Sequence, residues 1–167
     1  MRPGWSFSAE NGNLFRMRQR ELDQDQAEPH FQEVLDVYAD LASRPIDRQC
    51  TLRTECCHFK RTGLTPYLTH GEALLAAKAL RATGRRKLPE RQDGACPMLH
   101  QQTSRCMIYK DRPFGCRTHF CEAAGGPYAR AEVVDLIRRL EKIDAGLGGR
   151  GARPLPVAMA HALQELA

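Results

Sequence analysis

Residues 96–121 read CPMLHQQTSRCMIYKDRPFGCRTHFC. Within this stretch four thiols are separated by turn-forming residues, among them Pro97, Pro113 and Gly115. A single cysteine in a cytosolic protein is usually a small buried apolar residue. A cluster of cysteines among turns instead indicates a binding site at which several thiols come together.

A second group of cysteines lies upstream, beyond a predicted helix, so the thiols can meet only if the fold brings distant segments together. Zinc sites commonly use C-x(2–4)-C pairs, and only Cys116 and Cys121 have that spacing. A zinc ribbon or zinc finger is therefore not supported. We expect a site for zinc or iron, the latter including an iron–sulfur cluster. The predicted ligands are all seven cysteines: Cys50, Cys56, Cys57, Cys96, Cys106, Cys116 and Cys121.

The adjacent pair Cys56 and Cys57 constrains the number of metals. Neighbouring side chains point to opposite faces of a strand, or lie about 100° apart on a helix. We therefore expect either that the pair serves two metals or that one thiol binds while the other packs. His58 and His119 bring the candidate ligands to nine, enough for a cluster or for two sites, although a lone histidine is more often a surface residue.

Length and composition indicate an ordinary folded protein. A chain of 167 residues, 42% hydrophobic and 27% charged, can bury a core without disulfides. No segment is long or apolar enough to span a membrane, and the amino terminus has no apolar signal region. We therefore expect a cytoplasmic protein, in which clustered cysteines bind metal or act in catalysis rather than form disulfides.

The net charge of +5 is concentrated around the cysteines. Basic residues number 15 against 6 acidic ones in residues 44–121, compared with 4 against 8 before them and 6 against 6 after them. This surplus is consistent with a basic nucleic-acid-binding module. It is equally consistent with arginines that offset the charge of metal-bound thiolates, which we favour because no nucleic-acid recognition motif accompanies it.

Apolar periodicity predicts a mainly α, single-domain fold with an irregular cysteine-rich centre. One helix begins at Pro29 and ends before Pro45, and a second follows the capping-box residues Thr69 and Glu72. A third opens at Gly126 and Pro127 and includes an Asp135–Arg139 pair. The expected division is an N-terminal arm (1–27), a metal-binding domain (28–145), a flexible linker (146–155) and a C-terminal helix (156–167).

One short β-hairpin is compatible with the cysteine-rich centre. Residues 106–109 are strand-like, and KDRPFG, residues 110–115, is typical of a turn. Such a hairpin would place Cys106 opposite Cys116.

A cysteine-dependent enzyme is an alternative to a metal site. A catalytic thiol activated by histidine needs only one cysteine and leaves six unexplained. The sequence also contains no nucleophile elbow, Walker loop or dinucleotide fingerprint. Whether the protein is an enzyme is left open.

The cysteine spacing resembles that of a known family. The matching elements are Cys50-x5-Cys56-Cys57, Cys96-Pro97-Met98-Leu99, Cys106-Met107-Ile108-Tyr109 and Arg112-Pro113-x-x-Cys116-Arg117. In this order they are similar to the bacterial YkgJ-type cysteine-cluster family, regarded as a zinc- or iron-chelating domain. The resemblance covers about residues 50–121. Its motif also occurs in flagellin lysine methylases, which implies a metal-dependent protein-lysine methyltransferase-like enzyme or accessory as an alternative.

The sequence departs from the family pattern at one position. The family motif begins C-x-x-C-x-x-C-C, which places a cysteine where this chain has Arg53. The chain therefore has seven thiols instead of eight, and the resemblance implies either fewer bound metals or a ligand other than cysteine.

Overall fold

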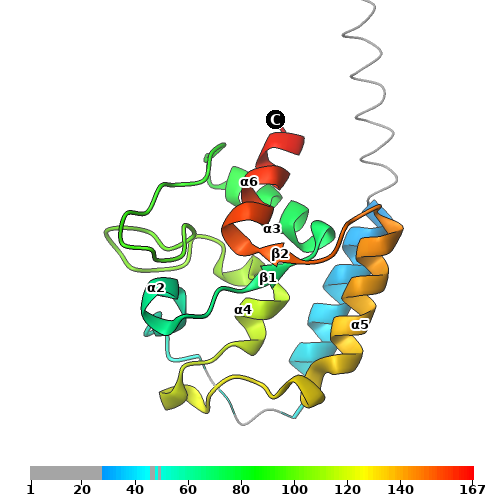
Figure 1. Ribbon diagram of the computed structural model, residues 1–167, viewed down its shortest axis with the longest axis horizontal. Coiled ribbons are helices and arrows are strands. Elements are labelled where there is room, and N and C mark those ends of the chain that lie inside the picture. Colours follow the sequence, from blue (N-terminus) through cyan, green and yellow to red (C-terminus); the bar gives the residue numbers. More distant parts are fainter. Residues whose placement is uncertain (1–27, 46–47, 49) are drawn as a thin grey trace, which may run out of the picture.

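Two long helices lie side by side at one edge of the molecule (Figure 1). The structure is a computed structural model, and it describes residues 28–45, 48 and 50–167. Residues 28–43 are helical, as predicted, and they pack against α5 (Arg130–Gly146). The buried residues between the two helices are Val34, Val37, Tyr38, Leu41, Val133, Leu136, Leu140 and Ile143. Helix α5 begins three residues after Pro127 rather than at it.

Ion pairs join these two helices at their exposed edges. Arg139 pairs with Asp40, and Arg44 pairs with Asp135. The predicted Asp135–Arg139 pair within α5 is therefore wrong. Each of its members instead binds a partner near the end of the first helix, because the two helices lie close enough for their charged side chains to meet.

A second helix pair forms the centre of the fold. Helix α3 (His70–Ala82) packs against α6 (Leu155–Glu165), and three alanines of α3 allow the close approach. The sequence predicted α3 as a largely buried helix, and this is confirmed. The buried residues shared by the two helices include Ala73, Ala76, Ala77, Leu80, Leu155, Ala158, Met159, Ala162 and Leu163.

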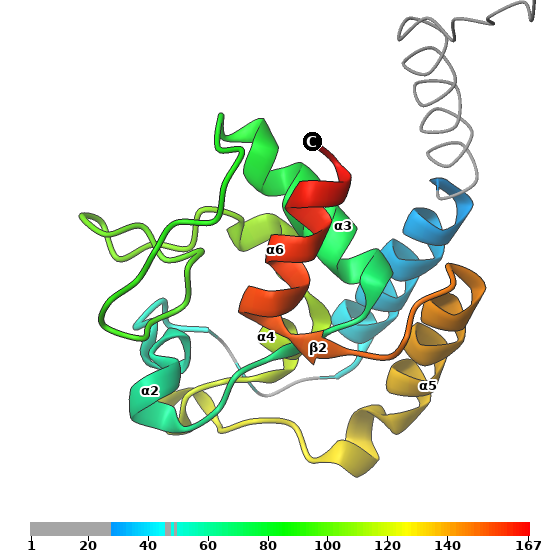
Figure 2. The ribbon, with the colours of Figure 1, turned by 45° about the horizontal axis from the view of Figure 1, so that its top comes forward.

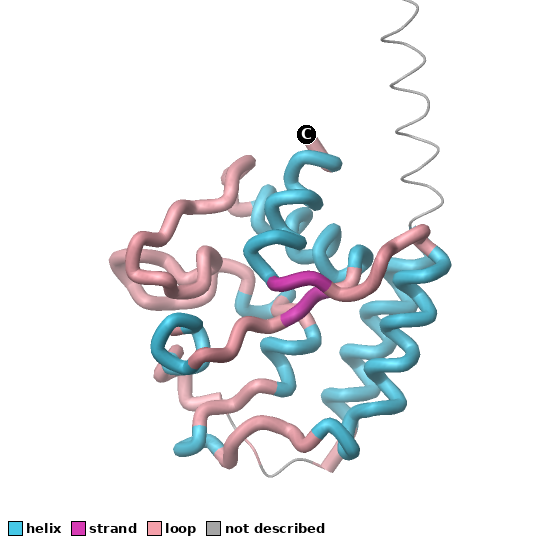
Figure 3. The backbone as a smooth tube through the Cα atoms, viewed as in Figure 1, coloured by secondary structure: helices cyan, strands magenta, loops and turns pink. Residues whose placement is uncertain are grey.

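The cysteine-rich centre consists mostly of loops and single helical turns (Figure 3), and one of these turns, α4 (Phe114–Thr118), contributes Phe114 to the core of the helix pair. Its helical pieces are η1 (Glu55–Cys57), α2 (Phe59–Thr62), η2 (Tyr109–Asp111), α4 and η3 (Glu122–Ala124). The predicted mainly α fold with an irregular cysteine-rich centre is confirmed. Figure 2 shows α4 between α2 and the helix of residues 28–43.

The predicted hairpin between Cys106 and Cys116 is not formed. Residues 109–111 and 114–118 are helical turns, because Pro113 precedes α4 as its N-cap instead of belonging to a β-turn. The two-stranded sheet in the described residues pairs β1 (Tyr67–Leu68) with β2 (Arg153–Pro154), which are antiparallel and distant in sequence. An isolated antiparallel bridge joins Leu99 to Cys106.

The predicted division of the chain stays a prediction. Its arm, residues 1–27, lies outside the described residues. The predicted C-terminal helix is present as α6, one residue earlier than expected, and its partner is α3 of the central pair. Among the described residues, no helix combines the length and the apolar character needed to cross a membrane.

Candidate metal centre

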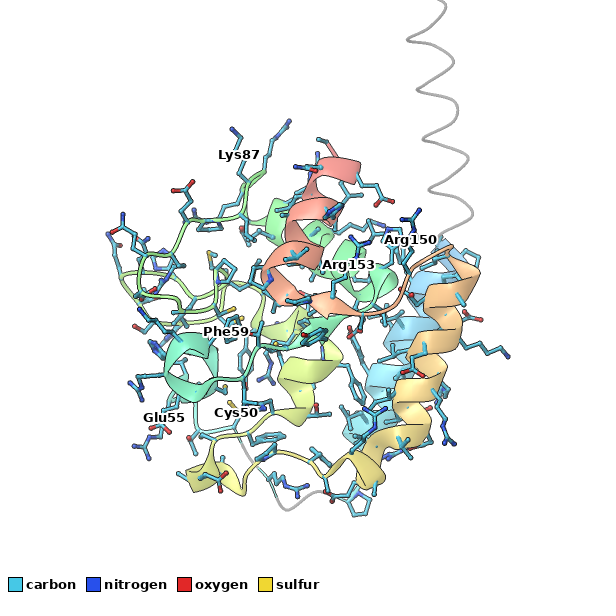
Figure 4. All side chains as sticks on the ribbon, viewed as in Figure 1. Cys50, Glu55, Phe59, Lys87, Arg150 and Arg153 are labelled. Carbon is cyan, nitrogen blue, oxygen red and sulfur yellow. The ribbon has the colours of Figure 1, made fainter. Side chains whose placement is uncertain are left out.

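Six of the seven cysteines line one cavity of about 340 Å³. They come from four short segments: residues 50–57, and three segments about forty or more residues further along that follow one another at intervals of ten residues. These six are Cys50, Cys56, Cys57, Cys96, Cys106 and Cys116. Cys121 does not line the cavity; it is the N-cap of η3, five residues beyond Cys116. Figure 4 shows Cys50 and Phe59 on the side of the molecule away from α5, where this cavity lies.

Main-chain hydrogen bonds hold three of the cysteine segments together. The Cys96 N–H donates to the Cys57 carbonyl at 2.6 Å, and the Met107 N–H donates to the Met98 carbonyl at 2.9 Å. Gly94 lets the first pair of segments approach, because a Cβ there would lie 2.9 Å from the Lys60 Cβ. The cysteine segments are therefore connected by the backbone and not only by their side chains.

Cys116 reaches the cavity from α4. The Arg117 side chain donates hydrogen bonds to the carbonyls of Arg112 (2.6 Å) and Lys110 (2.7 Å), which folds the preceding segment against this helix. Gly115 allows close contact with the approach to β1, because a Cβ there would lie 3.1 Å from the Pro66 Cβ. The sequence singled out Arg117 without identifying these partners.

Cys56 and Cys57 both line the cavity from η1, and each thiol shifts the pKa of the other. That the pair serves two metals, or that one thiol binds while the other packs, stays a prediction. A tight 3₁₀ turn brings the two sulfurs to the same side. The Cys57 thiol lowers the pKa of Cys56, while the Cys56 thiol and burial raise the pKa of Cys57 far above its ordinary value.

Burial acts against the charged form of the other thiols. It raises the pKa of Cys96 to about 12, and it raises the pKa of Cys106 and Cys116 as well. Neighbouring cysteines add to this effect, whereas the Arg112 guanidinium opposes it at Cys106 and Cys116. A group of thiolates in this cavity therefore requires more positive charge than the lining residues supply.

Arginine and aromatic groups also belong to the cavity lining. Arg105, Arg112 and Tyr109 are lining residues. The Arg112 guanidinium lies 4.0 Å from the centre of the Tyr109 ring and donates to the Tyr109 carbonyl at 3.1 Å. The structure thus places Arg112, which the sequence left ambiguous, within electrostatic reach of the thiols.

Of the histidines next to cysteines, one lines the cavity. His119 is a lining residue, and burial lowers its pKa, which favours the neutral form that binds metals. His58 is not among the lining residues and instead precedes α2 as its N-cap. The sequence treated the two histidines alike because each simply neighbours a cysteine.

Arg53 occupies the position at which the family pattern has a cysteine. Its side chain is 59% exposed and pairs with Glu55 at 3.2 Å, and it does not line the cavity. Glu55 points outward (Figure 4). In this arrangement Arg53 does not replace a missing ligand.

The segment between Cys50 and Cys56 is strained. Leu52 and Thr54 have φ values of 59° and 58°, in the left-handed region that branched side chains rarely adopt. A residue keeps such an unfavourable backbone conformation only where the surrounding structure holds it there, and such residues are frequent at binding sites. Both residues line the cavity, so the strain coincides with the candidate site.

We expect Thr54→Gly to stabilise the metal-free protein. The left-handed conformation costs a residue with a Cβ about 1–2 kcal/mol, and glycine avoids this but loses about 0.5–1 kcal/mol of chain entropy. The net gain in the free energy of unfolding should be at most about 1.5 kcal/mol, measured by urea denaturation. Thr51→Gly is the matched control, because Thr51 has no positive φ and its replacement should destabilise. Equal changes in the free energy of unfolding for Thr54→Gly and Thr51→Gly would contradict the claim that the backbone at Thr54 is strained.

The thiols do not form a closed ligand set as they are placed. In the part of the chain that the structure describes, no three histidine, cysteine or carboxylate side chains are arranged so that together they could hold a metal ion. The thiols share a cavity wall, and binding an ion therefore requires them to rotate toward it.

Much of the remaining cavity lining is apolar, and its distant members were not identified from the sequence. Phe59, Pro66, Met98, Ile108 and Leu155 belong to it. Leu155, the first residue of α6, lies 34 residues beyond Cys121 in the chain. No local pattern could have assigned it to the site, because the pairing of β1 with β2 is what brings it there.

A comparison with protein families identifies the cysteine-rich region. The family model that matches is described as "CxxCxxCC: Putative zinc- or iron-chelating domain", and it covers residues 48–134, just over half of the chain. Comparisons with curated proteins and with solved structures gave no match. The matched range contains all seven cysteines, and the predicted resemblance to the YkgJ-type family is confirmed, since this is the same family. The chain therefore belongs to the CxxCxxCC family of cysteine-cluster domains.

Proposed function

We propose that the protein binds zinc or iron through the six cysteines that line the cavity. The observation that carries this proposal is the convergence of six thiols from four segments on one cavity, with no carboxylate among the described residues that line it. The family to which the chain belongs supports the same chemistry. Cys121 stays a ligand predicted from the sequence alone.

The chemistry of the donors fits these metals. Thiolates are soft ligands that favour zinc, copper(I) and iron–sulfur clusters, whereas calcium and magnesium require oxygen ligands. A bound cation would supply the positive charge that the buried thiolates lack. Arg112 would offset part of the remaining negative charge, because its guanidinium already opposes the rise in pKa that burial causes at Cys106 and Cys116.

The number of thiols bears on how many metals the site holds. Structural zinc takes four ligands, so six cysteines and His119 exceed the needs of one ion. An iron–sulfur cluster also takes four thiolates. The surplus favours either two ions that share ligands or one cluster with further thiols beside it. The adjacent thiols of Cys56 and Cys57 suit a shared site because they lie on the same wall.

The decisive experiment is elemental analysis of protein purified without oxygen, together with its absorption spectrum. We expect at least one zinc or iron per chain. An iron–sulfur cluster would add visible absorption and inorganic sulfide, whereas zinc would add neither. Protein that is folded by circular dichroism, fully reduced, and free of both metals even after they are added would contradict the proposal.

The two other functions considered from the sequence stay predictions. The nucleic-acid-binding alternative rests on the basic surplus around the cysteines, and the structure pairs five of those basic side chains with carboxylates. These are Arg44, Arg48, Arg53, Lys78 and Arg91. The methyltransferase-like alternative rests on the shared family motif. Neither has an observation as specific as the thiol-lined cavity.

A further inference from the structure

Glu72 is a buried carboxylate outside the cavity that the metal-binding proposal does not use. Its side chain is 2% exposed and accepts four hydrogen bonds. Oε2 accepts from the Thr69 N–H at 3.0 Å and from the Thr69 hydroxyl at 2.9 Å. Oε1 accepts from the Tyr38 hydroxyl at 3.1 Å and from the Phe114 N–H at 2.8 Å.

These four bonds connect three separate parts of the fold. Thr69 is the N-cap of α3, and Tyr38 lies in the helix of residues 28–43. Phe114 is the first residue of α4. The capping box explains only the bonds to Thr69. The bonds made by Oε1 join helical elements that are 34 and 42 residues away in sequence.

The bond to Phe114 bears directly on a proposed metal ligand. Phe114 is the first residue of α4, so its N–H has no acceptor within that helix. Glu72 provides that acceptor from another helix. Cys116 follows two residues later, and its own N–H donates to the Pro113 carbonyl at 2.9 Å. Fixing the start of α4 therefore fixes the direction in which Cys116 leaves the backbone.

Tyr38 supports α4 from a second side. The Arg117 guanidinium lies 4.5 Å from the centre of the Tyr38 ring, while the Tyr38 hydroxyl donates to Glu72. Contacts therefore hold α4 on both sides of Cys116: Phe114 before it is bonded to Glu72, and Arg117 after it lies against Tyr38. All of these contacts are made by the chain itself, without a bound metal.

We propose that Glu72 is a positioning residue for the metal centre: it anchors the start of α4 so that the Cys116 thiol faces the thiols of the other segments. The proposal rests on the proposed function for its metal readout, and on thiol reactivity for a readout that needs no metal. Glu72 itself touches neither the metal nor a ligand atom.

The test compares Glu72→Gln with Asp144→Asn. Both carboxylates are buried, and in each one the two oxygens accept from different backbone N–H groups. An amide in either orientation therefore leaves one backbone N–H facing an NH₂ group. Asp144 binds the His70 and Gly151 N–H groups and does not line the cavity. It is therefore a control for the loss of stability alone.

We expect Glu72→Gln to weaken zinc binding about tenfold, the lower end of the range seen when a group that orients ligands is removed. It should also change the absorption spectrum of the cobalt(II)-substituted protein. Asp144→Asn should leave the zinc affinity and the cobalt spectrum unchanged at a comparable loss of thermal stability. Equal zinc affinity and identical spectra in both variants would overturn the positioning role.

The alkylation rate of Cys116 in metal-free protein, followed by mass spectrometry, separates this proposal from the proposed function. We expect at least about a threefold change in Glu72→Gln and none in Asp144→Asn, because loosening α4 changes local opening at Cys116. If the wild-type protein binds no metal, the alkylation rate of Cys116 alone tests the positioning role, and an unchanged rate in Glu72→Gln refutes it.

If Glu72→Gln does not fold, Tyr38→Phe takes its place, because it removes one donor to Oε1. We expect a smaller change in the alkylation rate in the same direction, and an unchanged rate in Tyr38→Phe would also refute the role.

Discussion

Replacing Cys116 with serine should remove most of the bound metal and loosen α4. A serine hydroxyl does not ionise at neutral pH and is a poor ligand for zinc or iron. The site therefore loses the thiolate that α4 contributes. Structural zinc contributes about 10–16 kcal/mol to folding in small peptides, which is comparable with the whole stability of a typical domain. Losing a share of that free energy should lower the midpoint of thermal unfolding of the metal-loaded protein by many degrees.

Cys121→Ser is the matched control for this substitution. Cys121 lies five residues further along the chain and does not line the cavity. The Cys121→Ser variant should keep the wild-type metal content and melting temperature. Metal per chain, thermal unfolding and limited proteolysis would be compared in both variants. Full loading and native melting in Cys116→Ser would contradict its assignment as a ligand, and equal losses in both would restore Cys121 to the ligand set.

The regular helices could be predicted because local rules determine them. Apolar residues recur along residues 28–43 and along α5 at helical spacing, and each of these faces is buried against the other. The capping pair Thr69 and Glu72 marks the start of α3. In these segments propensity, periodicity and capping all favour the same structure, so the sequence alone was sufficient.

The cysteine-rich centre could be predicted as a site but not as a structure. The sequence RPFG is compatible with a β-turn, yet in the protein it begins α4. The Phe114 N–H at the start of this helix donates to Glu72, which lies 42 residues away in sequence. The shared direction of Cys56 and Cys57 likewise depends on a 3₁₀ turn that has no apolar period to indicate it. In the cysteine-rich centre the conformation depends on contacts with residues far away in sequence, and such contacts leave no local sequence pattern.

The folded unit extends beyond the region that matches the family. The match ends at residue 134, but the apolar face of α3 is covered by α6, which begins at Leu155. Leu155 also lines the cavity, and its N–H donates to the Pro66 carbonyl at 2.8 Å. The C-terminal helix therefore contributes both to the core and to the wall of the candidate site, although the sequence places it beyond a flexible linker.

Met159→Ala should accordingly destabilise the whole protein by about 2–5 kcal/mol, the range for truncating a fully buried methionine. Met159 in α6 is 0% exposed and belongs to the core that α3 and α6 share. The loss combines the transfer free energy of the removed side chain with the cavity that remains. Chemical denaturation of metal-free protein, followed by circular dichroism, would measure it.

Val157→Ala is the control on the same helix, because Val157 is 46% exposed and should change the free energy of unfolding by less than about 1 kcal/mol. The two variants also test whether α6 unfolds with the rest. If α6 is part of one cooperative unit, Met159→Ala shifts a single transition to lower denaturant without changing its slope. A separate early transition that involves only α6, with the main transition unmoved, would show instead that the helix after residues 146–155 is energetically independent, as the sequence alone suggested. We expect the single transition, because removing the Met159 side chain opens a void in the core that α6 shares with α3, the helix that also holds Glu72.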